Sequence, residues 1–491
     1  MEHNRLAYDV VVVGAGNAAL CAALSARERG ASVVVLEKAP SSAQGGNCPY
    51  TGGGFRFVHE GIEDLRGLVS GLTDRQVANI DMGPYTAQDF ANHMVAVTHG
   101  GTDPELMDVI ISQSRPTVEW MHSKGVTWEL PDRVGQIALA PSVIPSSVGL
   151  TAWQSGVGLI QMLTTACRRA GVNIVYETKM LRLLQGQGGG VCGVTVQDVD
   201  GVHDIRSHGV VLACGGFEAN QEMRVKYLGR GWEMAKVRGA KYNTGDGHRA
   251  AMEVGAKPVG QWTGCHATPI DYDAPPTGVL EATDKMPRRS YPLGITVNLA
   301  GRRFFDEGEG FAEQTFVDVA RYILEQQRSL AFQIFDSKAA VHLEGRYRTS
   351  KAIEAGTIQE LASKLQVRPA ALSATVEAFN AEAHEGEYSP RELDGRSTRN
   401  VDPPKTNWAL KIDSPPFVAY KVTGGITYTF GGPKIDTRGQ VVDMEDRPIP
   451  GLFAAGEIVG GILSHNSLRA AGLMHGSVFG KLAGTNAAGS G

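Results

Sequence analysis

The sequence predicts an α/β fold in which both ends of the chain build one Rossmann-like domain and an α+β capping domain is inserted between them. A strand–helix–strand pattern opens the chain at Val10–Glu37, and a strand followed by glycines returns at Gly451–Glu457. The stretch between them changes to Pro-rich loops and further helices. Because 491 residues exceed one compact core, we predict a first domain from residues 1–260 and 420–491, and a capping domain at 261–419.

The opening residues form a compact βαβ pattern. Apolar residues at Tyr8–Val13 predict a strand, and after a glycine turn the helical pattern runs to about Arg29. Gly30 is a helix stop, and Ser32–Leu36 predicts the second strand. This order is typical of the start of a doubly wound sheet.

The turn after the first strand carries a dinucleotide-binding fingerprint, Gly14-Ala15-Gly16-Asn17-Ala18-Ala19. Gly14 permits the tight turn, Gly16 lets the backbone approach a pyrophosphate, and Ala19 allows close helix–strand packing. Glu37 ends the second strand, where a carboxylate accepts hydrogen bonds from ribose hydroxyls and repels a 2′-phosphate. A tight turn without a ligand is the alternative, but the complete strand–helix–strand–acid pattern favours a dinucleotide site.

Further elements follow in the same style. After the first unit the pattern predicts helices at Pro104–Lys124 and Gly156–Ala170, strand Asn173–Tyr176, a β-meander over Met180–Asp200 and strand Gly209–Ala213. In the insertion it predicts strand Ile295–Asn298 and helices at Ala312–Gln326, Ala352–Lys364 and Pro369–His384. Near the C-terminus it predicts strand Gly451–Ala455 and helix Ala471–Ala483.

Composition excludes several classes of protein. With 47 basic and 52 acidic residues the formal charge is -5, so there is no electrostatic case for nucleic-acid binding. No window approaches the roughly 20 apolar residues of a membrane span, and the first residues lack a secretory pattern. The six cysteines lack CxxC spacing, so we expect no metal or iron–sulfur cluster in the chain. We expect a cytoplasmic protein, peripheral to a membrane only through a partner.

Glycine-rich segments beyond the fingerprint carry a family resemblance. They are Gly45-Gly46-Asn47, Gly52-Gly53-Gly54, Ala213-Cys214-Gly215-Gly216-Phe217, Asn243-Thr244-Gly245-Asp246-Gly247 and Gly451-Leu452-Phe453-Ala454-Ala455-Gly456-Glu457. In this order they resemble flavoproteins of the fumarate reductase, succinate dehydrogenase and 3-ketosteroid dehydrogenase superfamily, over essentially the whole chain. The closest likeness within it is to the tricarballylate dehydrogenases, at Tyr8–Glu28, Gly301–Gly310, Asp413–Phe417 and Gly472–Gly484.

The resemblance implies FAD as the cofactor. Glu457 is then expected at the ribitol of FAD, and the start of the helix at Ala471–Leu473 at the pyrimidine edge. The expected cofactor residues are Gly14, Gly16, Asn17, Ala18, Glu37, Lys38, Gly45, Gly46, Asn47, Thr51, Gly52, Gly53, Ala213, Gly215, Gly216, Asp246, Gly456, Glu457, Ala471 and Leu473. Succinate dehydrogenases attach FAD to a histidine five residues before a glutamine that matches Gln44, and the corresponding residue is Ala39. We therefore predict non-covalent FAD.

The expected catalytic residues depart from the family pattern. Phe311 stands where fumarate reductases place their proton-transferring arginine, and Tyr428 replaces a substrate histidine. The nearby substrate arginine is displaced by two positions to Arg469, whereas His266 keeps the place of the family histidine. Arginine suits a carboxylate substrate because its planar fork pairs with both oxygens. The predicted catalytic residues are Tyr428, Arg469, His266, Arg289 and Arg288, with Tyr291, His465 and Arg56 as further candidates.

The resemblance predicts an FAD-dependent dehydrogenase or reductase acting on CH–CH groups. The preferred substrate is a tricarballylate-like polycarboxylate, with hydride transfer to or from flavin N5 and electrons exchanged with a separate iron–sulfur or quinone-linked partner. One alternative is a cyclic ketone (enone) or an aromatic acid, with Tyr428 and Tyr291 acting beside the carbonyl. Another alternative is a non-catalytic flavoprotein that transfers electrons and has no substrate of its own. For Tyr428 and His266 a purely structural role stays open.

Overall fold

The computed structural model describes residues 7–131, 142–143, 149–389 and 392–489, which form two compact units. The first unit is Met1–Met223, Ala240–Cys265 and Tyr428–Gly491, and the second is Arg224–Gly239 and His266–Thr427. Thus 224–239, expected in the first domain, belongs to the second unit. The reason is that β12 (Lys236–Val237) pairs with β18 (Phe417–Thr429).

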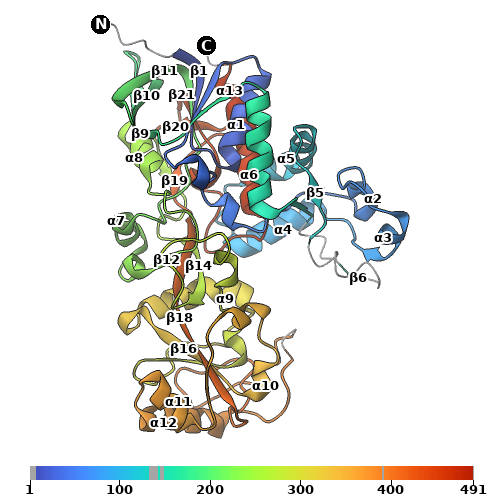
Figure 1. The fold of residues 1–491 in the computed structure, drawn as a ribbon, viewed down its shortest axis with the longest axis vertical. Helices are drawn as coiled ribbons and strands as arrows, with labels where there is room; N and C mark the ends of the chain where they lie inside the picture. The colour runs from blue at the N-terminus through green and yellow to red at the C-terminus, as the bar shows by residue number, and fades with distance from the viewer. Residues whose placement is uncertain (1–6, 132–141, 144–148, 390–391, 490–491) are drawn as a thin grey trace. The chain divides into compact units, whose positions relative to one another are not determined.

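The first unit is built on a mixed eight-stranded sheet (Figure 1). Its main path runs β20 (Gln440–Val442), β21 (Pro448–Ala454), β11 (Gly201–Leu212), β1 (Ala7–Val13), β2 (Val33–Leu36) and β8 (Asn173–Val175). From β21 to β8 the neighbours are parallel, while β9 (Lys179–Gln185) and β10 (Val191–Asp198) continue from β11 as an antiparallel meander. The predicted Rossmann-like α/β architecture is confirmed.

The central strands end in register at one edge of this sheet. Val13 pairs with Leu36 on one side and Leu212 on the other, and Leu212 pairs with Ala454. The next residues of the four strands therefore leave the sheet together, and they include Gly14, Glu37, Ala213 and the segment ending in Glu457. Ligands bind in open α/β sheets beyond such carboxyl ends.

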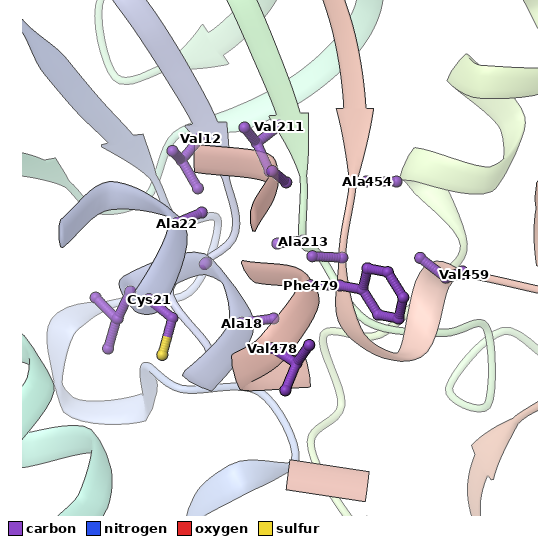
Figure 2. Packing of buried hydrophobic residues seen from close by; sticks show 14 of the residues in the cluster. Val12, Ala18, Cys21, Ala22, Val211, Ala213, Ala454, Val459, Val478 and Phe479 are labelled. Atoms are coloured by element: carbon purple, nitrogen blue, oxygen red, sulfur yellow. The ribbon is translucent and has the colours of Figure 1, made fainter. Parts of the chain in front are cut away.

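Helix α13 (Ala471–Ala487) packs closely against α1 (Asn17–Glu28), and Figure 1 shows them side by side in red and blue. A Cβ placed on Gly480 would lie 2.4 Å from the carbonyl oxygen of Ala18, and one on Gly484 would lie 2.0 Å from that of Ala22. Figure 2 shows the small side chain of Ala18 in this core near Val478 and Phe479, and that of Ala22 farther along, near Val12. Glycine is therefore required where the two helix backbones approach most closely.

The rest of the first unit surrounds this core. Its other helices are α2 (Ile62–Leu65), α3 (Asp74–Ala78), α4 (Ala87–Thr98), α5 (Pro104–Ser123), α6 (Ser155–Arg169), α7 (Gln221–Met223) and α8 (Asp246–Glu253). Its small sheets pair β3 (Gly54–Phe55) and β5 (Trp128–Glu129) with β7 (Leu150–Ala152), β4 (Ile80–Asp81) with β6 (Ser142–Val143), and β13 (Pro258–Val259) with β19 (Gly432–Pro433). Across the described ranges of both units, no helix combines the length and apolar character needed to span a bilayer.

The second unit is built on a six-stranded sheet. Its path is β12, β18, β16 (Ala331–Phe335) and β15 (Ile295–Asn298), and β14 (Cys265–Asp271) and β17 (Ile353–Ala355) also pair with β18. The helices are α9 (Ala312–Leu324), α10 (Ser337–Ala340), α11 (Ile358–Leu365) and α12 (Pro369–Glu382). Apolar residues of α11 and α12 share one core cluster with β15 and β16.

The helix predicted at Ala352–Lys364 is wrong in its first turn. Residues Ile353–Ala355 form β17 instead, and α11 begins only after Thr357. The side chain of Thr357 accepts a hydrogen bond from the backbone N–H of Glu360, which is typical of a helix N-cap. These residues form a strand because they pair with β18 in antiparallel fashion, and local periodicity in the sequence does not reveal this pairing.

Candidate functional site

A cavity opens in the first unit at the carboxyl edge of the sheet. It is lined by the turn Val13–Ala18, by Leu36–Ala39, by Gly45–Cys48, by Ala213–Gly215, by Ala455–Glu457 and by the start of α13 at Gly472 and Leu473. All of these segments belong to one compact unit, although they come from both ends of the chain. The in-register strand ends and the packing of α13 on α1 bring them together.

The structure brings most of the predicted cofactor residues to this cavity. The exceptions among them are Gly52, Gly53, Gly216 and Ala471, which do not line it. Gly216 lies directly behind the lining, where a Cβ would be 2.0 Å from Oε1 of Glu457. Sequence reasoning missed several lining residues, notably Thr178, Lys179, Met180, Asn243, Leu463 and His475.

Glu37 fixes the glycine turn to the end of β2. Its Oε2 accepts a hydrogen bond from the N–H of Ala15 at 2.9 Å, and its Oε1 accepts one from the N–H of Ala39 at 2.8 Å. Burial raises the pKa of Glu37, and these backbone donors act in the opposite direction. The carboxylate is therefore held at the cavity wall, where further lone pairs remain for hydroxyl donors.

Lys38 and Asp246, both predicted cofactor residues, form one polar cluster. The Lys38 ammonium donates to Asp246 Oδ2 and to Thr244 Oγ1, each at 2.6 Å. Burial raises the pKa of Asp246, but the hydrogen bond and charge of Lys38 outweigh it and leave the pKa below its ordinary value. Lys38 and Asp246 thus form an ion pair, in which each charge is compensated by the other, on the wall of the cavity.

Glu457, which lines the cavity, and the buried Glu218 behind it form a pair of adjacent carboxyl groups. Glu218 is fully buried, and its Oε1 accepts from the side-chain amides of Asn47 at 2.7 Å and Asn243 at 2.6 Å. Burial, and next the neighbouring Glu218, hold the pKa of Glu457 well above its ordinary value, and the two side chains are hydrogen-bonded to each other. Burial also raises the pKa of Glu218. Two adjacent buried carboxylates cannot both be ionised at low cost, so the pair retains a proton.

His475 presents an imidazole to the same cavity from α13. It is 5% exposed, and its Nδ1 is buried without a hydrogen-bond partner among the described residues. Burial lowers the pKa of His475 to about 4, so the ring is neutral near pH 7. Buried polar atoms are normally satisfied, so Nδ1 indicates a ligand partner in the cavity. Its place one helical turn after Ala471 was the available signal in the sequence.

The cavity fits FAD. The lining offers a glycine turn at the N-terminus of α1 for a pyrophosphate, the Glu37 carboxylate for ribose hydroxyls, and Glu457 with His475 for a polar chain or ring. A Cβ on Gly14 would lie 2.4 Å from the carbonyl oxygen of Ala213, so the turn approaches the next strand too closely for any other residue. Donors and acceptors therefore follow one another along a groove of glycine backbone.

The predicted catalytic residues of the first unit differ in their surroundings. Tyr428 lines the cavity, and its ring centroid is 5.9 Å from that of Phe430. Arg469 is exposed and does not line the cavity; it stands in the loop before α13. His465 is also exposed, with its ring centroid 4.4 Å from that of His99. Of these residues only Tyr428 is placed against the cofactor cavity.

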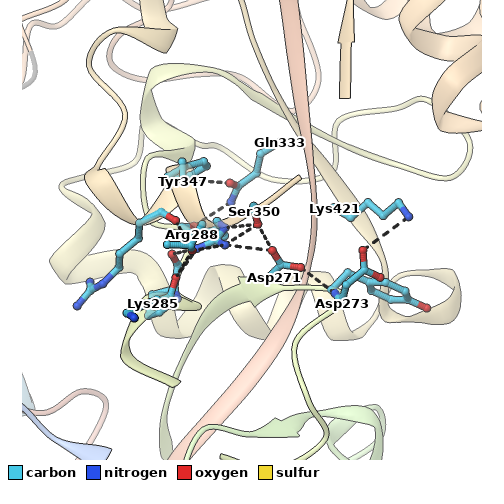
Figure 3. A network of polar contacts seen from close by, with 12 residues as sticks. Asp271, Asp273, Lys285, Arg288, Gln333, Tyr347, Ser350 and Lys421 are labelled. Carbon is cyan, nitrogen blue, oxygen red and sulfur yellow. Dashed lines mark hydrogen bonds and ion pairs between the residues drawn. The ribbon is translucent and has the colours of Figure 1, made fainter. Parts of the chain in front are cut away.

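Arg288 has a structural environment in the second unit, shown in Figure 3. The residue is fully buried, and its Nη2 pairs with Asp271 Oδ2 at 3.0 Å. Its Nη1 donates to the backbone oxygens of Lys285 and Pro287, each at 2.8 Å, and Ser350 accepts from Nε at 3.1 Å. The guanidinium charge and donors are thus engaged within the unit, which leaves no free fork for a substrate.

Arg289, the adjacent residue, is held differently. Its Nε donates to Thr268 Oγ1 at 3.0 Å, and its Cζ lies 4.2 Å from the ring centroid of Phe316. Burial, and next the charge of Arg238, lower the pKa of Arg289 to about 10. No carboxylate among the described residues forms an ion pair with it. His266 packs on the same phenyl ring at 5.1 Å between centroids, so the structure groups two predicted catalytic residues.

Tyr291 and Phe311 are packing residues. Tyr291 is 1% exposed, and its hydroxyl is hydrogen-bonded to Thr315 Oγ1 at 2.6 Å. Phe311 stands at the N-cap of α9, with its ring 5.8 Å from that of Trp408. The neighbouring segment has a structural role as well, since Arg303 and Glu307 form a buried ion pair and Glu307 accepts from the N–H of Thr296.

The chain belongs to the FAD binding domain family, which matches it over residues 9–473. It is 29% identical over 98% of its length to the probable fumarate reductase Ifc3 of Shewanella frigidimarina, covering 74% of that protein. It is also 27% identical over 93% of its length to a 3-oxosteroid 1-dehydrogenase of Mycobacterium tuberculosis, covering 94% of it. The predicted class of enzyme, an FAD-dependent dehydrogenase or reductase acting on CH–CH groups, is thereby confirmed.

A solved structure agrees with this assignment. The open conformation of a flavocytochrome c3 fumarate reductase matches with a TM-score of 0.73 and 26% identity, over 99% of this chain and 78% of that chain. The match extends through both compact units, so the fold of the second unit is also that of the family. The resemblance to this superfamily is confirmed, whereas the closer likeness to tricarballylate dehydrogenases stays a prediction.

The carboxyl pair gives a testable pH dependence. Because the folded pair keeps a proton that unfolded glutamates lose above about pH 4.3, the free energy of unfolding should fall as pH rises from there, by up to about 1.4 kcal/mol per pH unit for one proton. Glu218→Gln removes the second carboxyl group and keeps an amide that bonds Glu457. Denaturant unfolding of the FAD-free protein between about pH 5 and 8 should show a slope smaller by about one proton.

The control for this experiment is Glu105→Gln, since Glu105 is an exposed acid in the first turn of α5. This variant should retain the slope of the unaltered protein. An unchanged slope in Glu218→Gln would show that the two carboxyl groups do not share a proton.

Proposed function

We propose that the protein dehydrogenates or reduces a C–C bond beside a carboxylate in a small tricarballylate-like polycarboxylate. The observation that carries this proposal is Arg289: its half-buried guanidinium is stacked on Phe316 and forms no ion pair with a carboxylate among the described residues, although the charge of Glu344 acts on it. A cation held in this way is a ready binder of a substrate carboxylate. Removing a charge from water is costly unless an anion compensates it, and the substrate supplies that anion.

The proposed chemistry divides the work among cofactor and side chains. When bound, FAD would supply hydride transfer at flavin N5. In the oxidising direction Tyr428, as its phenolate, takes the proton from the neighbouring carbon, and in the reducing direction its phenol returns that proton. Arg289 holds a carboxylate and lowers the energy of negative charge that develops beside it, with His266 as a further donor. The hydride and the proton together account for the two hydrogens that are removed from, or added to, the two adjacent carbons.

We further propose that FAD is bound without a covalent bond. Support comes from Ala39, which stands where succinate dehydrogenases carry the attaching histidine, and from the absence of any histidine among the residues of Leu36–Cys48 that line the cavity. Denaturation of the yellow protein with acid should release all the flavin into the supernatant as free FAD. Flavin that stays with the precipitated chain, and a corresponding mass increase, would contradict non-covalent binding.

Electron exchange is proposed to use a separate iron–sulfur or quinone-linked protein. The chain matches Ifc3 over 74% of the length of that protein. On this proposal, steady turnover needs an added electron donor or acceptor.

A second candidate is the oxidation of a cyclic ketone to its enone. It is favoured by Tyr428 on the wall of the cavity and by the similarity to a 3-oxosteroid 1-dehydrogenase. It needs no cation such as Arg289, however, and the second tyrosine first considered for it, Tyr291, is buried and hydrogen-bonded to Thr315.

Anaerobic bleaching of the flavin separates the two candidates. Tricarballylate should bleach the visible absorbance of bound FAD, or the unsaturated acid should restore it after chemical reduction. Arg289→Gln should slow the reaction by about 10–100-fold at low substrate, since hydrogen bonds to charged groups contribute about 1.5–3 kcal/mol. Tyr428→Phe should slow it by about 10²-fold or more with FAD still bound.

Arg321→Gln is the matched control, because Arg321 is an exposed arginine of the same unit that pairs with Asp318 at 2.8 Å. This variant should react like the unaltered protein. If only saturated cyclic ketones bleach the flavin and no carboxylate does, the second candidate replaces the first.

A further inference from the structure

Three cations surround one carboxylate at the wall of the cofactor cavity. The ammonium of Lys38 lies 2.6 Å from Oδ2 of Asp246. Oδ1 of the same carboxylate is 3.4 Å from Lys179 Nζ and 3.2 Å from Arg249 Nη2. Lys179 is the first residue of β9, and Arg249 lies in α8 (Figure 1). One carboxylate compensates a single cation, so Lys179 and Arg249 leave surplus positive charge at this wall.

The cluster lies beside the carboxylate that is expected to meet the ribose. The backbone N–H of Thr178 donates to the carbonyl oxygen of Glu37 at 3.0 Å, and residues 178–180 line the cavity next to the end of β2. A carboxylate in the position of Glu37 accepts hydrogen bonds from adenosine ribose hydroxyls. The surplus charge is therefore at the end of the cavity that suits the adenosine half of FAD.

The two surplus cations also reach solvent. Lys179 lines the cavity although 42% of its side chain is exposed, and the side chain of Arg249 is 53% exposed. Asp246, which holds them both, is only 12% exposed. Exposed ion pairs of this kind add little to stability. A lining side chain that is also open to water marks the mouth of the cavity, where a ligand enters.

A third exposed cation belongs to the same region of the first unit. Lys241 is exposed, and its Nζ lies 5.3 Å from the ring centroid of Tyr242, which lines the cavity. The acids nearby are Asp246, the exposed Glu177 and the buried Glu37, whose carboxylate already accepts two backbone N–H groups. Among the residues that the structure describes, solvent-accessible cations thus outnumber solvent-accessible acids here.

The sign of the local charge is opposite to that of the whole chain. The formal charge of the protein is -5, and FAD is an anion because of its pyrophosphate, so the overall field opposes their encounter. At physiological salt a charge acts over about 8 Å, so the cations at the entrance dominate the last part of the approach.

We infer that Lys179, Lys241 and Arg249 form a cationic mouth that attracts the pyrophosphate of FAD and guides the cofactor into its cavity. Asp246 keeps Lys179 and Arg249 at the entrance without cancelling both charges. The mouth acts on the rate at which FAD associates, as rim charges do, and not on the lifetime of the bound cofactor. It concerns the loading of FAD and is independent of the substrate.

The test is stopped-flow mixing of FAD with the full chain freed of FAD, followed by flavin fluorescence. At about 10 mM salt the association rate constant should fall by about 3-fold in Lys179→Gln and in Arg249→Gln, and by about 10-fold in the double variant. At about 1 M salt these differences should vanish, because the screening length shortens to about 3 Å. The dissociation rate constant, measured on dilution, should change by less than about 2-fold.

Two further variants are the controls. Lys179→Arg keeps the charge and should keep the association rate of the unaltered protein. Lys364→Gln makes the same change in net charge in the second unit, where Lys364 is an exposed lysine that pairs with Glu360 at 2.8 Å. It should associate with FAD like the unaltered protein. The final flavin content of each sample shows that the FAD-free chain is intact.

Three results would overturn the inference. They are an association rate constant of the unaltered protein that does not fall with salt, equal rates in Lys179→Gln and Arg249→Gln at low salt, or a loss confined to the dissociation rate. The last would make these side chains contacts of bound FAD. Each outcome is distinct from failure of the proposed function, which is decided by whether a carboxylate bleaches the bound flavin.

Discussion

The close packing of α13 on α1 is the contact on which the cofactor cavity depends. Gly480 and Gly484 let the backbone of α13 approach the carbonyl oxygens of α1, and the side chain of Asn17 adds hydrogen bonds to the Leu473 carbonyl and the Ser477 hydroxyl at 2.9 and 2.8 Å. This contact joins the first and last parts of the chain. Because Gly472, Leu473 and His475 line the cavity from α13, any separation of the two helices would remove one wall.

The same constraint explains how polar groups are gathered at one edge. Parallel strands ending in register deliver backbone and carboxylates from four separate segments, and burial then gives each group a distinct state. Asp246 is ionised beside Lys38, whereas Glu457 and Glu218 keep a proton between them. Arg289 in the second unit differs from these groups, because no carboxylate among the described residues forms an ion pair with its guanidinium, although the charge of Glu344 acts on it.

Local sequence patterns predicted the parts of the fold and site that depend on short-range geometry. The βαβ unit, the glycine turn and Glu37 follow from spacing alone. Sequence patterns did not distinguish Arg288 from Arg289, because the two are adjacent residues of the same type. Only the fold decides that Arg288 pairs with Asp271 and that Arg289 stacks on Phe316. The sequence also did not reveal Glu218 as the partner of Glu457, nor the contacts of the candidate residue Arg56, since these come from segments far away in the chain, such as Asn243 and Arg469.

The central claim is that helix–helix packing between the two ends of the chain builds the FAD cavity, and Gly480→Ala tests it most directly. The added methyl group would meet the Ala18 carbonyl oxygen, so the free energy of unfolding should fall by about 1–3 kcal/mol and FAD should bind more weakly. Gly188→Ala is the control, because nothing lies within 4 Å of a Cβ at that position. Unchanged stability and FAD affinity in Gly480→Ala, measured by denaturant unfolding and flavin titration, would contradict the account.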